Sequence, residues 1–179
     1  MSGVWLPPEQ YIATLPKATV YAALYVTDEA GRPVLLRVAR NPKMFQFPGG
    51  NLDTEETPWE CALRECREET GLTLTLEPRL LLMHYLPPLG SWTVNKIGFI
   101  FDGGVLSQDQ IDSIVLDPGE HTEVVVHTLD EWRQLQNPAS TRRLEAVDRA
   151  RRTGITCYLE HTPQGDGPTT DTRPMPGPN

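Results

Sequence analysis

Runs of apolar and β-branched residues along the chain predict a series of short strands. Thr19–Thr27 and Pro33–Ala39 are rich in strand-forming residues and flank a turn at Asp28–Gly31, which predicts a hairpin. Four further segments have a strand-like composition: Arg79–Leu86, Thr93–Phe101, Glu123–Thr128 and Ile155–Leu159.

A helix is predicted shortly after a Gly-rich turn at Pro48–Gly50. Thr57 can act as the N-terminal cap, Pro58 suits the first helical position, and Glu60 completes a capping box. Gly71 marks the end of the helix, because glycine readily adopts the left-handed conformation found there. Between these signals, apolar residues at helical spacing define one buried face: Trp59, Ala62, Leu63 and Cys66.

Two more helices are predicted in the second half of the chain. Leu129–Gln136 and Ser140–Arg152 have a helical composition. The second carries an apolar stripe that includes Leu144 and Val147, and Gly154 is its stop signal. Strands and helices together predict an α/β fold, a mixed sheet with helices on its faces.

The chain of 179 residues is long enough for one domain with its own core. Residues 1–17 are punctuated by proline and are expected to wrap the surface of a domain that spans residues 18–160. Residues 161–179 consist mainly of Pro, Gly, Thr and Asp, so this C-terminal tail is expected to be disordered.

Composition restricts the environment and the partners. The formal net charge of −8 argues against a nucleic-acid backbone as the main partner. The apolar runs are far too short to span a membrane, and the N-terminus does not have the charged-then-apolar order of a signal peptide. Cys61, Cys66 and Cys157 lack metal-ligand spacing, and a disulfide between the first two is not expected. A reducing cytoplasm is the simplest location.

Three glutamates, Glu65, Glu68 and Glu69, fall on one stripe of the predicted helix, beside its buried face. Like charges at this spacing repel by about 0.2–0.5 kcal/mol per exposed pair. Arg64 and Arg67 are the nearest cations in sequence, and both are expected to project away from the centre of the stripe. A solvated charged face is the common explanation for such glutamates, but the adjacent buried face and Gly-rich turn favour a bound cation such as Mg²⁺, which prefers carboxylate oxygens.

The sequence from Gly50 to Leu72 resembles the Nudix box, G-x5-E-x7-R-E-U-x-E-E-x-G-U, in which U is a bulky aliphatic residue. All the fixed residues of that pattern are present: Gly50, Glu56, Arg64, Glu65, Glu68, Glu69 and Gly71. Cys66 stands at an aliphatic position, where a small buried thiol alters packing and not chemistry. The resemblance implies the Nudix fold, an α/β/α sandwich with a mixed central sheet, and a metal-dependent hydrolase of diphosphate bonds.

The resemblance also implies the ligands of the metal ion. Glu65, Glu68 and Glu69 are expected to bind Mg²⁺ or Mn²⁺, with the carbonyl of Gly49 as a further ligand. Such an ion neutralises the diphosphate and lowers the pKa of a bound water. A carboxylate then takes the proton as water attacks phosphorus, and the candidates for this base are Glu65, Glu69 and Glu120.

Other positions carry supporting roles in the family. Arg64 is expected to orient a catalytic glutamate by hydrogen bonding, and Glu56 to support the loop. Many members take another acid from a loop beyond the box; here Glu120 is the first candidate for that ligand or base and Glu123 the second. An ordinary surface turn explains Glu120 equally well. The adjacent His121 is expected to be exposed.

Substrate contacts are predicted from position alone. Arg37, Arg40 and Lys43 enter the Gly-rich turn and can meet phosphates, with a solvated strand end as the alternative. Three aromatic residues can stack on a base, although aromatic residues on strands more often belong to a core: Phe45, Phe47 and Trp92. Pro87 lies where ADP-ribose hydrolases of this family tend to carry proline, but a turn explains it equally well.

The predicted function is hydrolysis of a nucleoside diphosphate linked to another group, or of a nucleoside triphosphate. One alternative is a catalytically silent module that binds a nucleotide sugar, but such modules typically lose box glutamates that this chain retains. An isomerase of diphosphate substrates would need a catalytic cysteine, and none of the three cysteines stands at the expected position. A homodimer in which residues 1–17 reach the partner's pocket remains open.

Overall fold

A mixed sheet of eight strands forms the centre of the molecule in the computed structural model, which describes residues 5–161. Six strands follow the order β3-β2-β1-β6-β5-β8, while β4 pairs with β1 and β7 pairs with β2. The strands are β1 Ala18–Asp28, β2 Pro33–Val38, β3 Phe45–Gln46, β4 Gly49–Asn51, β5 Leu80–Leu86, β6 Asn95–Leu106, β7 His121–Val126 and β8 Cys157–Glu160. The helices are α1 Pro8–Thr14, α2 Pro58–Thr70, α3 Gln108–Asp112, α4 Leu129–Leu135 and α5 Pro138–Thr153.

The pairing of the strands confirms the predicted hairpin and the mixed character of the sheet. β1 and β2 are antiparallel, whereas the long central pair β1–β6 and the edge pair β5–β8 are parallel. β6 continues to Leu106 rather than ending at Phe101, because it stays beside β1 through a register shift. Gly103 permits this close packing, since a Cβ atom there would lie 2.4 Å from a methyl group of Val26.

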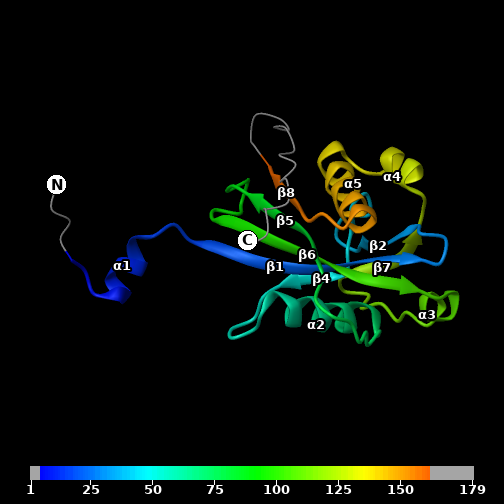
Figure 1. The fold of residues 1–179 in the computed structure, drawn as a ribbon, viewed down its shortest axis with the longest axis horizontal. Helices are drawn as coiled ribbons and strands as arrows, with labels where there is room; N and C mark the ends of the chain where they lie inside the picture. The colour runs from blue at the N-terminus through cyan, green and yellow to red at the C-terminus, as the bar shows by residue number, and fades with distance from the viewer. Residues whose placement is uncertain (1–4, 162–179) are drawn as a thin grey trace, which may run out of the picture.

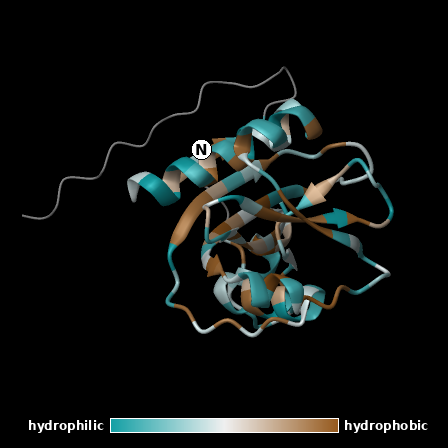
Figure 2. Ribbon diagram, turned by 90° about the vertical axis from the view of Figure 1, so that its right-hand side faces the viewer, coloured by the Kyte–Doolittle hydropathy of each residue, from teal (hydrophilic) through white to brown (hydrophobic). Residues whose placement is uncertain are grey.

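Helices cover both faces of the sheet, so the predicted α/β/α sandwich is confirmed. α2 lies on one face, and α4 and α5 lie on the other (Figure 1). One hydrophobic cluster joins α2 to the sheet through residues such as Ala62 and Leu24, and a second joins α4 and α5 to the opposite face through Trp132 and Leu144. The helices in Figure 2 carry both hydrophobic and hydrophilic residues, as expected for elements with one buried face.

Local signals position α2 as predicted. The Thr57 side chain accepts a hydrogen bond from the Glu60 backbone, the Glu60 carboxylate accepts one from the Thr57 backbone, and Gly71 ends the helix at φ 74°. The buried face is rotated relative to the prediction. It is formed by Cys61, Ala62, Cys66, Glu69 and Thr70, whereas Trp59 and Leu63 are partly buried. One of the stripe glutamates therefore lies inside the protein.

The N-terminal segment differs from its prediction. Residues 8–14 form the short helix α1, whose side chains are exposed, and the helix stands away from the body at the start of β1 instead of wrapping the surface (Figure 1). Of the predicted C-terminal tail, residues 162–179 lie outside the described residues. Within the described part of the chain, no helix is long and apolar enough to cross a membrane.

Replacing Thr57 with alanine is expected to lower the free energy of unfolding by about 1 kcal/mol, because it removes the side-chain half of the capping box. Urea denaturation at neutral pH measures this change. Thr57→Ser keeps the hydroxyl and is the matched control, expected to stay within about 0.5 kcal/mol of the native protein. An equal decrease in the free energy of unfolding for both variants would show that the Thr57 hydroxyl does not stabilise the helix.

Candidate active site

A cavity of about 300 Å³ opens where α2, β4 and the start of β7 meet. Pairing of β4 with β1 fixes Gly49 and Gly50 in one wall of this cavity. Pairing of β7 with β2 brings Glu120 and His121 to the same cavity. Glu65 and Glu69 enter from α2. Residues that are distant in sequence thus supply the carboxylates of one pocket.

Glu69 is the buried carboxylate of this pocket, with 4% of the residue exposed. One oxygen accepts a hydrogen bond of 2.8 Å from the backbone N–H of Gly49. Burial raises the pKa of Glu69 to about 8, with the charges of Glu65 and Glu120 adding to the rise and the Gly49 hydrogen bond opposing it. The acid therefore changes charge near neutral pH when no cation is present.

Glu65 lies directly against the backbone of β4. A Cβ atom on Gly50 would lie 2.3 Å from a carboxylate oxygen of Glu65, so only glycine leaves room for this side chain. Burial also raises the pKa of Glu65, against the effect of the neighbouring Arg64. The first glycine of the box is thus required by the position of a box glutamate.

Arg64 lies among the acids, contrary to the prediction that it projects away from them. Its guanidinium donates to Glu56 at 2.8 and 2.9 Å, to Glu65 at 2.9 Å and to Glu68 at 2.9 Å. The hydrogen bonds to Arg64 lower the pKa of Glu56 to about 2. Glu68 is half exposed, does not line the pocket, and is held by Arg64. Of the three stripe glutamates, Glu65 and Glu69 line the pocket.

Glu120 and His121 complete the cluster. One ligand atom from each of Glu69, Glu120 and His121 lies within 4.8 Å of the others. The prediction that His121 is exposed is wrong, because only 3% of the residue is accessible and its Nε2 lies 3.6 Å from a Glu69 oxygen. The ring is buried because β7 begins at His121 and pairs with Val38 in the sheet.

The donor set of this pocket fits a divalent cation. Glu65, Glu69 and Glu120 line the same pocket, and among residues 5–161 an arginine is bonded to Glu65 but none, nor any lysine, to Glu69 or Glu120. Both ring nitrogens of His121 lack a hydrogen-bond partner among the described residues. Hard cations bind oxygen-rich sites of this kind, and the Gly49 carbonyl belongs to the same wall.

The residues predicted to bind substrate differ in where the structure places them. Arg40 lines the carboxylate pocket, and Lys43 is exposed. Arg37 forms an ion pair of 2.6 Å with Glu123 and stacks over Phe45, so Glu123 is engaged away from the pocket. Phe45 is 4% exposed and packs edge-on against a tryptophan of the core. Its ring is therefore unavailable to stack on a base in this structure.

A second cavity of about 280 Å³, which the sequence did not reveal, shares the β4 wall with the first. Tyr21 and Phe47 form aromatic walls, and Lys96 and Arg143 bring two cations. Lys96 Nζ lies 5.2 Å from the ring centre of Tyr21, and the Arg143 guanidinium lies 5.4 Å from that of Phe47. Neither cation forms an ion pair with a carboxylate within residues 5–161.

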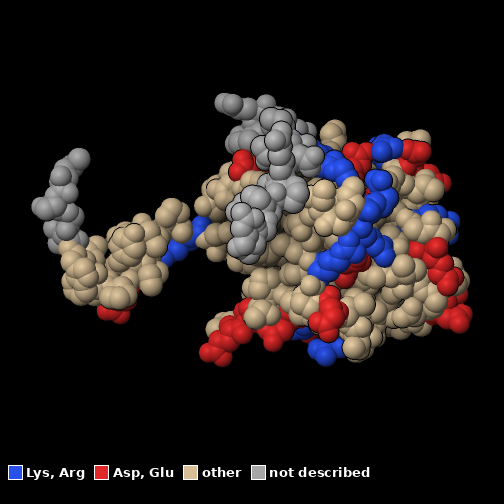
Figure 3. Space-filling view, viewed as in Figure 1, with Lys and Arg blue, Asp and Glu red and all other residues tan. Residues whose placement is uncertain are grey.

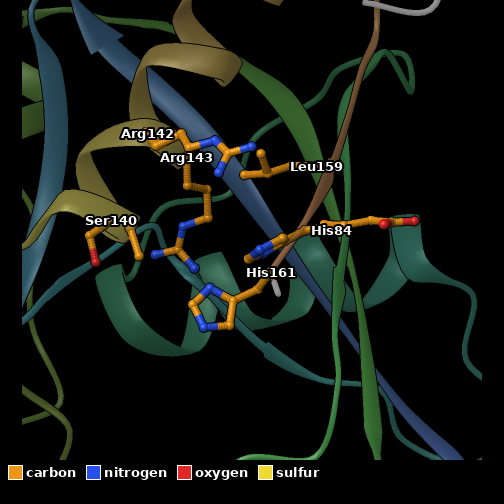
Figure 4. A pocket seen from close by; sticks show the side chains of 8 residues that line it. His84, Ser140, Arg142, Arg143, Leu159 and His161 are labelled. Atoms are coloured by element: carbon orange, nitrogen blue, oxygen red, sulfur yellow. The ribbon is translucent and has the colours of Figure 1, made fainter. Parts of the chain in front are cut away.

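A smaller cavity of about 80 Å³ lies on the other side of Arg143, between α5 and β8. Figure 4 shows Arg143 reaching from α5 toward His84 and His161, while Arg142 extends toward Leu159. Burial and the nearby Arg143 lower the pKa of His84 to about 3, so its ring is neutral, and Nδ1 hydrogen-bonds to the hydroxyl of Tyr21 at 2.9 Å. This contact fixes the Tyr21 ring in the wall of the second cavity.

Charge is unevenly distributed on the surface despite the net charge of −8. Figure 3 shows a band of basic side chains across one face of the body, from the α5 side toward α2, with acidic side chains beside its lower end. A field of this kind attracts anionic small molecules to one face.

The comparisons with known proteins agree with this geometry. The NUDIX domain model matches residues 17–149, so the chain belongs to the Nudix family and by class is a pyrophosphohydrolase. One similar solved structure is a MutT protein from Methanosarcina mazei Go1, with 24% sequence identity and a TM-score of 0.61 over 76% of this chain and 97% of that one. Another is a C. elegans Ap4A hydrolase, with 22% identity and a TM-score of 0.59 over 76% of this chain and 98% of that one. A UDP-X diphosphatase is also similar, with 20% identity and a TM-score of 0.63 over 86% of this chain and 75% of that one. Identities this low show a shared fold. None of the curated proteins compared with the chain matches it.

The raised pKa of Glu69 predicts a pH-dependent stability of the metal-free protein. Between pH 4.5 and about 8 the folded protein holds a proton on Glu69 that the unfolded chain has lost, so its stability falls as pH rises through this window. Glu69→Gln removes this dependence and is expected to be more stable than the native protein at pH 8, by roughly 1–3 kcal/mol. Urea denaturation in the presence of a chelator at pH 5 and pH 8 measures the difference, with the exposed Glu77→Gln as control. Parallel pH profiles for all three proteins would contradict the assigned shift.

Proposed function

We propose that the protein hydrolyses the diphosphate bond of a nucleoside diphosphate linked to another group, or of a nucleoside triphosphate, with Mg²⁺ or Mn²⁺ bound in the carboxylate pocket. The observation that carries this proposal is the meeting of Glu65, Glu69 and Glu120 at the Gly49–Gly50 wall. The Gly49 carbonyl is the further ligand in this proposal, and Glu68, the remaining ligand predicted from the sequence, is bonded to Arg64 and does not line the pocket.

Each group of the pocket has a distinct part in the proposed reaction. A bound divalent ion supplies charge neutralisation of the diphosphate and a lower pKa for the attacking water. Glu120, which is exposed at the rim, is the proposed acceptor of the proton of that water, and Glu69 and Glu65 are the other candidates for this base. Arg64 holds Glu65 in a fixed orientation through its 2.9 Å hydrogen bond.

The second cavity is the proposed site for the rest of the nucleotide. It shares Gln46, Gly49, Gly50 and Asn51 with the carboxylate pocket, so one substrate can occupy both. Lys96 and Arg143 offer two positive charges without a carboxylate partner among the described residues, which favours a substrate that carries negative charge beyond the reacting phosphates.

Three further predictions from the sequence belong to this proposal. A cytoplasmic location fits the three cysteines, which are all free and buried. Homodimer formation and the preference for ADP-ribose suggested by Pro87 stay predictions. The alternative of a silent binding module is disfavoured because the full set of box glutamates is present.

The catalytic assignment predicts that Glu69→Gln loses at least about 100-fold in kcat, because the amide binds a cation poorly and carries no negative charge. The protein is incubated with a panel of nucleoside triphosphates and nucleoside diphosphate derivatives in Mg²⁺ or Mn²⁺, and released phosphate or monophosphate is quantified. The exposed Glu29→Gln variant is the control and retains native rates. Tight metal-independent binding of a nucleotide without turnover would instead identify a binding module.

The charge of the second cavity predicts a selective defect in Lys96→Met. We expect kcat/KM for triphosphates to fall by roughly 10-fold, the loss of about 1.4 kcal/mol of interaction with an anionic group. Substrates with a neutral group beyond the diphosphate should change less than about 3-fold. Lys17→Met, outside both cavities, serves as the control. A uniform decrease across the panel would mean that Lys96 does not sense substrate charge.

A further inference from the structure

One imidazole in the carboxylate pocket lacks the hydrogen bonds that a buried polar group normally has. His121 is 3% exposed, and neither Nδ1 nor Nε2 has a hydrogen-bond partner among the described residues. Buried polar groups in native proteins are almost always paired, so an exception indicates a group that is satisfied by something else. The environment of the ring identifies what that partner is.

The ring of His121 lies close to two carboxylates, at distances typical of side chains that bind one metal ion. His121 Nε2 lies 3.6 Å from Glu69 Oε1, which is too long for a hydrogen bond. Ligand atoms of His121, Glu69 and Glu120 all lie within 4.8 Å of one another, and all three residues line the same cavity. Atoms that coordinate one ion lie close together in this way, because each of them contacts the ion directly.

The backbone holds the ring in this direction. His121 N donates to the carbonyl of Asp117 at 2.8 Å, and the residue pairs with Val38 as the first position of β7. The carbonyl of Glu120 accepts a 2.7 Å hydrogen bond from Ala39. Both residues are thus fixed to β2 and its following turn, and the carboxylate and imidazole project from consecutive positions into one pocket.

We propose that His121 is a nitrogen ligand of the divalent ion that Glu69 and Glu120 bind. This inference rests on the metal site of the proposed function and adds a neutral nitrogen donor to its oxygen donors. Imidazole nitrogen suits transition ions, whereas Mg²⁺ prefers oxygen ligands. The site therefore discriminates between ions, and binds Mn²⁺ or Co²⁺ more tightly than Mg²⁺ beyond the difference expected from carboxylates alone.

Pulsed electron paramagnetic resonance of the full-length protein with one equivalent of Mn²⁺ tests this coordination directly. We expect modulation from a directly bonded ¹⁴N nucleus, which changes to the ¹⁵N pattern when the protein is produced with ¹⁵N-labelled histidine. This measurement needs no substitution, so it does not depend on the folding of a variant. Bound Mn²⁺ without histidine nitrogen coupling overturns the inference while leaving an oxygen-only metal site intact. Absence of Mn²⁺ binding overturns both this inference and the proposed function.

A matched pair of variants assigns the nitrogen. In His121→Gln the ¹⁴N modulation should disappear, and the affinity for Co²⁺, measured by calorimetry, should fall at least about 10-fold, the lower end of the loss on removing even a supporting group of a metal site. The Mg²⁺ affinity should change much less. His127→Gln, which alters a partly exposed histidine outside the pocket, keeps the native signal and affinity. Persistence of the nitrogen signal in His121→Gln would assign the coupling to another histidine and refute the role of His121.

Discussion

The hydrogen bond from the Gly49 N–H to the carboxylate of Glu69 is the contact on which the rest of the site depends. It ties α2 to β4 at the point where both reach the pocket, and it keeps an acid inside the protein that would otherwise be drawn to solvent. With Glu69 held there, Glu65 lies against Gly50, and the helix presents its acids at a fixed depth. An ionised carboxylate in this position destabilises the protein without a cation and is stabilised by one. The contact that shapes the pocket therefore also favours the binding of a cation there.

The two cavities have opposite electrostatic character and share one wall. Carboxylates on the α2 side favour a cation, whereas Lys96 and Arg143 on the far side favour an anion. Arg64 keeps this separation, because it neutralises Glu56 and Glu68 outside the pocket and leaves Glu69 without a cationic partner among the described residues. In the proposed function, a phosphate-bearing substrate spans this boundary, with its reacting group in the carboxylate pocket and its remaining charge on the basic side.

Local sequence signals predicted the parts of the fold that local physics determines. The hairpin and the capped helix α2 follow from turn residues and caps within a few positions, and the spacing of the box placed Glu65 and Glu69 on the same pocket. Features set by long-range packing were missed. The burial of His121 depends on its pairing with Val38, and the position of Lys96 beside Tyr21 depends on β6 lying next to β1. The prediction that Arg64 projects away from the acids was also wrong, because its long side chain can bend back toward them whatever the direction of its Cα–Cβ bond.

The parallel pairing of β1 with β6 has a consequence for how the protein folds. The two strands pair only after the chain has passed through β2, β3, β4, α2 and β5, so their contacts close a long loop. Pairing of this kind forms slowly and late compared with local hairpins. Since Tyr21 and Lys96 lie on these two strands, the second cavity exists only once the central sheet is complete. A ligand that binds this cavity would therefore stabilise the whole folded domain rather than one loop.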